Sequence, residues 1–118
     1  MVRTPVTVLA ACLASPALAV DPADTPPPRP TETTTRCENG EVWNPGTGSC
    51  TPPEEARLDD GALFDAAREL AHAGRYDDAD RVLDAVEDGG SGAVLTYRGF
   101  IARERGDWAA AEAFYGAA

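Results

Sequence analysis

The sequence predicts an all-α fold, in which two antiparallel helix-turn-helix repeats follow a proline-rich linker and a small disulfide-closed hairpin. The main observation is a repeated segment. Residues 74–79 read Gly-x-aromatic-x-x-Ala, and residues 106–111 read the same at a period of 32 residues. Each copy follows one Ala- and Arg-rich helical pattern and opens another. A repeat of this length is typical of stacked supersecondary units, which usually present binding surfaces.

Residues 1–19 have the pattern of a secretory signal, with an apolar run over 6–14 and a small-x-small cleavage site ending at Ala19. The apolar run is shorter than the roughly 20 residues that span a bilayer, so we expect no membrane span. The alternative is a bacterial lipobox, Leu-Ala-Ala-Cys, in which Cys12 would be lipidated. The pattern predicts an exported protein, periplasmic or secreted, that is cleaved after Ala19.

The charge of the chain narrows the choice of partner. Its 118 residues include 20 acidic and 10 basic side chains, for a net charge of −10, and every basic residue is Arg. Such acidity argues against nucleic acid and anionic lipid surfaces as partners. The charge serves solubility, or it steers a basic partner toward the acidic faces.

Residues 20–36 are expected to be a linker. This stretch holds five prolines and a cluster of threonines, and it has little apolar surface to bury. Proline fixes φ and removes a backbone donor, so we expect an extended and mobile segment.

Residues 37–50 are expected to form a cystine clasp. The segment 41–43 has strand character, and the Asn-Pro-Gly at 44–46 is turn chemistry. In an exported protein Cys37 and Cys50 should pair, which stabilises such a loop by about 3 kcal/mol. The Cys-x-x-Gly-x-x-Trp-x6-Cys pattern resembles small extracellular cystine modules, including some that bind carbohydrate. Trp43 would then stack on a sugar, or it is the miniature core of the clasp.

Apolar residues recur at helical spacing through residues 59–118. We expect a first helix capped by Asp59 or Asp60 and stopped by Gly74, and a second that starts near Asp77. A glycine-rich break at 88–92 precedes a third helix. The fourth starts at Asp107, and the two repeats span about 60–91 and 92–118.

At these residues the chain resembles the tetratricopeptide repeat (TPR) family, over about half of its length. The resemblance implies a TPR-like α-solenoid in an exported bacterial protein. In it, Gly permits the left-handed turn, the aromatic fills the wedge beside that turn, and Ala packs against the preceding helix. The period is 32 rather than the usual 34, and Ser91 stands where the family often has Pro. The structural repeat residues are Gly74, Tyr76, Ala79, Gly106, Trp108 and Ala111.

Further positions fit the resemblance. Ala67 and Gly99 fall where the two helices of a repeat approach most closely, and Leu83 and Tyr115 match a large apolar site. Repeat arrays usually need about three units and a polar cap. We therefore expect additional repeats in a longer chain, self-association, or a clasp that folds back onto the stack.

The resemblance also implies a ligand surface on the concave face made by the first helix of each repeat. Aromatic rings and two arginines suit an extended peptide, because rings give apolar area and guanidinium groups hold carboxylates. The Lys and Asn set of the chaperone-binding members is absent, so their ligand is not implied. Alternatively, the two Phe residues are core. The peptide-binding positions are Phe64, Arg68, His72, Thr96, Tyr97, Phe100 and Arg103.

The sequence gives no sign of catalysis. His72 is the only His and has no evident nucleophile or acid partner, and Gly89-Gly90-Ser91-Gly92 lacks the Lys of a phosphate loop. The acidic cluster at 77–80 fits a helix N-terminus better than a calcium site. We expect no cofactor and no metal. The predicted function is non-catalytic scaffolding of envelope proteins; the alternative is a cell-wall or polysaccharide binder that uses Trp43.

Overall fold

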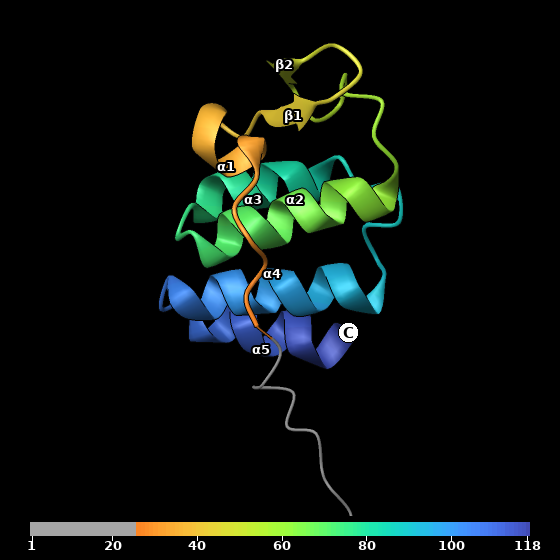
Figure 1. Cartoon of the computed structure of the whole chain (residues 1–118). Helices are drawn as coiled ribbons and strands as arrows, with labels where there is room; N and C mark the ends of the chain where they lie inside the picture. The colour runs from red at the N-terminus through yellow and green to blue at the C-terminus, as the bar shows by residue number, and fades with distance from the viewer. Residues whose placement is uncertain (1–25) are drawn as a thin grey trace, which may run out of the picture.

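The computed structural model describes residues 26–118. The expected signal sequence, Cys12 and the first part of the linker lie outside them. In Figure 1 the small sheet and α1 form one end, α2 and α3 the middle, and α4 and α5 the other end. Within the described part, no helix is long and apolar enough to cross a bilayer. The elements are α1 (Glu32–Arg36), β1 (Val42–Asn44), β2 (Ser49–Thr51), α2 (Asp60–His72), α3 (Tyr76–Asp84), α4 (Gly92–Glu104) and α5 (Trp108–Ala117).

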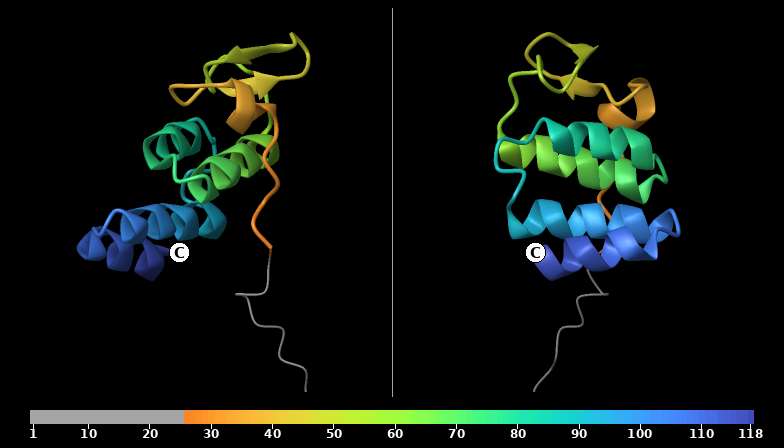
Figure 2. Two further views of the ribbon diagram at one scale, coloured as in Figure 1. Left: turned by 60° about the vertical axis from the view of Figure 1, so that its left-hand side comes forward. Right: turned by 180° about the vertical axis from the view of Figure 1, so that it is seen from behind.

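The helices pack as two pairs, α2 with α3 and α4 with α5 (Figures 1 and 2). The turns inside the two pairs have the same backbone geometry. Gly74 and Gly106 adopt φ of +78° and +79°. The N–H of the residue after each glycine donates at 2.9 Å to the carbonyl five residues earlier. This left-handed helix end favours Gly, because other residues are strained there. The repeat in the sequence is therefore also a repeat of backbone geometry.

Side-chain caps set the beginnings of three helices. Asp59, Ser91 and Asp107 each accept a hydrogen bond from a backbone N–H in the first turn of the helix that follows. Asp60 has a different role, because its carboxylate accepts the N–H of Glu87 at 2.9 Å and that of the next residue at 3.1 Å. Of the two cap candidates, Asp59 is the cap, and Asp60 ties the end of the first pair to the start of α2.

The hydrophobic core is shared by the helix pairs and the N-terminal segment. Leu70 of α2, Leu83 of α3 and Ile101 of α4 are fully buried in it. Val42 of β1 and Ala56 belong to the same cluster and are also fully buried. The cystine segment is thus part of the core and not a separate unit.

The two repeated aromatics differ in their surroundings. Tyr76 is half-buried and packs against the core. Trp108, which we expected to fill the same wedge in the second pair, is 68 % exposed. The reason is position: α3 has the second helix pair stacked beside it, whereas α5 packs on α4 at the end of the described stack (Figure 1).

The linker expectation is wrong at its C-terminal end, where Glu32–Arg36 form helix α1 instead of an extended segment. Thr31 caps this helix, Glu32 lies in its first turn and Arg36 in its last, as the helix dipole favours. Thr33 is buried, and its hydroxyl accepts the N–H of Trp43 at 3.1 Å. The Thr cluster that suggested a mobile tail is therefore a short helix packed on the hairpin.

The cystine clasp is confirmed as a disulfide-closed hairpin. Cys37 and Cys50 are bonded, and β1 and β2 pair antiparallel with Trp43 opposite Cys50. The turn is built by Asn44, whose carbonyl accepts the N–H of Gly48 at 2.8 Å. The Asn44 side chain also donates to the carbonyl of Ala56 at 3.0 Å and so fixes the exit from the hairpin. We call residues 31–56 the cystine module.

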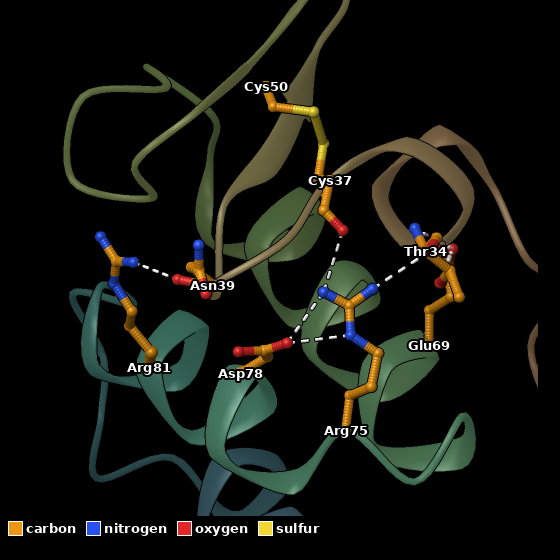
Figure 3. Close-up of polar contacts among 8 residues, drawn as sticks. All are labelled: Thr34, Cys37, Asn39, Cys50, Glu69, Arg75, Asp78 and Arg81. Atoms are coloured by element: carbon orange, nitrogen blue, oxygen red, sulfur yellow. Dashed lines mark hydrogen bonds and ion pairs between the residues drawn. A yellow bond between two sulfur atoms is a disulfide. The ribbon is translucent and has the colours of Figure 1, made fainter.

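Polar side chains of the first helix pair hold the cystine module in place (Figure 3). The Glu69 carboxylate, 6 % exposed, accepts the N–H of Thr31 at 2.5 Å and that of Thr34 at 3.2 Å, and also both hydroxyl groups. Arg75 donates to the carbonyls of Thr34 at 3.1 Å and Cys37 at 2.9 Å and pairs with Asp78 at 2.8 Å. The module thus covers the first helix pair, at the end of the stack away from α5.

Arg81 of α3 makes a further contact, donating to the carbonyl of Asn39, and Gly40 beside it is buried with φ +74°. A Cβ at Gly40 would lie 2.6 Å from Arg81 Cδ. We expect Gly40→Ala to lower the free energy of unfolding by about 2 kcal/mol, because it adds overpacking to a left-handed φ.

Gly48→Ala is the matched control, since Gly48 has φ +64° but open space around its Cα. It should cost only the conformational part, about 1 kcal/mol. Urea unfolding of the two variants measures the difference, and equal losses would show that the Arg81 contact contributes nothing.

Candidate functional site

The predicted peptide-binding residues come together on the face formed by α2 and α4. Six of them line one open groove of about 270 Å³, together with two residues that the sequence did not indicate, Pro26 and Tyr115. The seventh, Phe64, packs edge-on against Tyr97 with ring centroids 5.3 Å apart. The six are Arg68 and His72 of α2 and Thr96, Tyr97, Phe100 and Arg103 of α4.

The floor of the groove is a chain of aromatic contacts. Tyr97 and Phe100 have ring centroids 5.8 Å apart, and His72 stacks on Phe100 at 5.3 Å with an interplanar angle of 27°. Phe64, Tyr97 and Phe100 are half-buried and pack on the core, whereas His72 is exposed. The alternative that both Phe residues are core thus agrees with their packing, but Phe100 still borders the groove.

Hydrogen bonds and arginines fix the polar side of the groove. The Tyr97 hydroxyl accepts a hydrogen bond from Arg68 Nε at 3.0 Å and lies 3.2 Å from His72 Nε2. The guanidinium of Arg68 lies 5.6 Å from the Tyr97 ring centroid, and that of Arg103 lies 5.4 Å from the Phe100 centroid. Such cation–π contacts hold the arginines over the rings, and their remaining N–H groups face no carboxylate from another element among the described residues.

Tyr115 enters the groove because Gly99 has no side chain. A Cβ at Gly99 would lie 2.7 Å from Tyr115 Cε1, so any larger residue displaces this ring. The resemblance to the TPR family placed Gly99 where the two helices of a repeat approach most closely and Tyr115 at a large apolar site, without pairing the two. The available signal was a Gly on α4 opposite an aromatic on α5, which allows the ring to cross the helix.

We expect Gly99→Ala to destabilise the native chain by about 1 kcal/mol, because the methyl group pushes the Tyr115 ring out of its packing. In a Tyr115→Ala background the same change should instead stabilise by about 1 kcal/mol, the helix-propensity gain of Ala over Gly. A double-mutant cycle by urea unfolding measures the reversal. The same sign in both backgrounds would contradict the contact.

The carboxylates of the acidic cluster at the start of α3 form ion pairs with arginines. Asp77 and Asp80 both pair with Arg105 at the end of α4, Asp80 at 2.6 Å, and Asp78 pairs with Arg75 at 2.8 Å. Asp77 and Asp80 therefore connect the first helix pair to α4. Asp78 connects α3 to the cystine module through Arg75. Between residues 26 and 118, no group of three or more His, Cys, Asp or Glu side chains could hold a metal ion.

Trp43, the candidate sugar-stacking residue, lies away from this groove. Its ring is half-buried, and the guanidinium of Arg36 lies 5.2 Å from the ring centroid. It borders a shallow hollow with Leu58 and Ala62 at the start of α2. The ring thus lies between the cystine module and the first helix pair.

No protein-family model, no curated protein and no solved structure matches this chain.

Proposed function

We propose that the protein is a non-catalytic, exported interaction protein that binds an extended peptide on the face of α2 and α4. The observation that carries the proposal is the convergence of aromatic and arginine side chains from two separate helices in one open groove. Its helix pairs would be two TPR-like repeats, which the matching turn geometry at Gly74 and Gly106 supports.

The chemistry of the groove suits a peptide. Half-buried rings supply apolar contact area, and the ring-stacked Arg68 and Arg103 supply donors for backbone carbonyls or carboxylates. Arg68 pairs with Asp65 at 3.8 Å and Arg103 with Glu104 at 3.3 Å, so a ligand carboxylate would share each arginine with an acidic residue of the same helix.

We further propose that the protein is exported and that α5 carries an assembly surface. The Cys37–Cys50 disulfide suits an oxidising compartment outside the cytoplasm, in keeping with the predicted export signal. The exposed Trp108 on α5 suits contact with additional repeats or a second copy. We favour peptide binding over polysaccharide binding through Trp43, because Arg36 stacks on the Trp43 ring and the cystine module covers the first helix pair.

The test is peptide selection from a random displayed library, followed by affinity measurement with purified variants. We expect Arg68→Ala combined with Arg103→Ala to weaken the selected peptide at least tenfold, which corresponds to about 1.4 kcal/mol. The control is Arg57→Ala, which removes an exposed arginine that lies outside the groove. Unchanged affinity in the double variant would refute binding at this face.

A further inference from the structure

Pro26, a residue of the proline-rich segment, lines the aromatic groove. Figures 1 and 2 show the chain after the grey trace, from residue 26, passing α4 and α2 crosswise on its way to α1. Of residues 26–30, all but Arg29 are proline, and Pro28 is half-buried. One residue of this segment, Pro26, therefore already borders the proposed ligand surface.

The far end of this segment is fixed to α2. Thr31 donates its N–H and its hydroxyl to the Glu69 carboxylate at 2.5 to 3.0 Å, and Glu69 lies one residue from Arg68 of the groove. A polyproline II segment rises about 3.1 Å per residue, so five residues reach about 15 Å. That reach exceeds the 8–10 Å between the axes of packed helices, so the segment can cross from α2 to α4.

The groove has the features that recognise polyproline II. Proline rings pack on aromatic side chains, and a polyproline helix makes no internal hydrogen bonds, so its carbonyls remain free acceptors. Tyr97 and Phe100 provide the rings, and Arg68 and Arg103 provide donors on either side. Because proline fixes φ in advance, binding such a segment costs little chain entropy.

We propose that residues 26–30 are a resident ligand of this groove, and that the partner which displaces them is itself a proline-rich polyproline II segment. The inference rests on the proposed function, which it narrows to one class of peptide. A short tether holds a ligand at a local concentration in the millimolar range. A weak external peptide must then compete with it, and its apparent affinity falls in proportion to the fraction of free groove.

The experiment compares the intact chain with a variant in which Pro26, Pro27, Pro28 and Pro30 are all replaced by Ser. The probe is a synthetic peptide of residues 22–30, titrated while the His72 ring signals are followed by NMR. We expect the variant to bind the peptide at least tenfold more tightly than the intact chain. Without peptide, its His72 signals should already differ from those of the intact chain. Pro45→Ser, at an exposed proline of the hairpin turn, is the control and should change neither quantity.

Equal affinities with unmoved His72 signals would overturn the inference. A library-selected peptide that still binds through Arg68 and Arg103 would in that case leave the proposed function standing. If neither kind of peptide binds this face, both proposals fail. A resident ligand that weakens the external peptide at least tenfold also stabilises the native state by that factor, so urea unfolding of the Ser variant should show a loss of at least about 1.4 kcal/mol.

Discussion

Replacing Glu69 by Ala is expected to lower the free energy of unfolding by about 3 kcal/mol. The carboxylate is 6 % exposed and accepts hydrogen bonds from two backbone N–H groups and two hydroxyls, those of Thr31 and Thr34. Removing it leaves these donors without their partner, at a cost of roughly 1–3 kcal/mol for each one that water cannot reach. Urea unfolding of the purified variant measures the loss.

Glu112→Ala is the matched control for this prediction, because Glu112 is an exposed glutamate on α5. It should change the stability by less than about 0.5 kcal/mol. A Glu69→Ala protein as stable as this control would show that the cystine module is not held through the buried carboxylate.

Replacing Cys37 and Cys50 together by Ser is the second change with a large expected effect. The disulfide closes a loop with a sequence separation of 13, and losing such a closure costs about 3 kcal/mol in the chain-entropy model. The effect should extend to the helices, because Val42 inside the loop is fully buried in the shared core. Circular dichroism of the helices during urea unfolding measures this loss of stability.

Reduction provides the control for the disulfide. A reductant should destabilise the native chain by the same amount and leave the double Ser variant unchanged. Ser49→Ala, beside the bond but exposed, should have almost no effect. If helix unfolding were identical with and without the disulfide, the module and the helix pairs would not form one cooperative unit.

Much of the helical fold could be predicted because its determinants are local. Gly74 and Gly106 end helices through a left-handed conformation that few other residues adopt, and Asp59 caps through its own side chain. Cys37 and Cys50 were the only cysteines left after the expected cleavage, so their pairing had no competitor.

The parts that the sequence did not reveal depend on contacts between distant residues. Thr31 and Glu69 are 38 positions apart, and neither carries a pattern that identifies the other as its partner. Because this hydrogen bond cannot be inferred from the sequence, the Thr cluster suggests a polar tail, and the sequence did not predict α1. The exposure of Trp108 likewise depends on what packs against α5, which no local pattern states.

For the candidate site, the resemblance to the TPR family implied that residues of α2 and α4 share a face. It could not show that Tyr115 crosses above Gly99, because that depends on the packing of α5. Nor could it show that Pro26 reaches the groove, since the path of this segment depends on the anchor at Glu69.

The location of peptide binding can be measured with three side chains that occur rarely in this chain. His72 is the only His and stacks on Phe100 in the groove. The two Trp residues lie elsewhere, Trp43 in the cystine module and Trp108 on α5. In an NMR titration with the library-selected peptide, we predict that the His72 ring signals shift while both indole N–H signals stay in place. Shifts of the Trp43 or Trp108 indole with His72 unmoved would contradict binding at the face of α2 and α4.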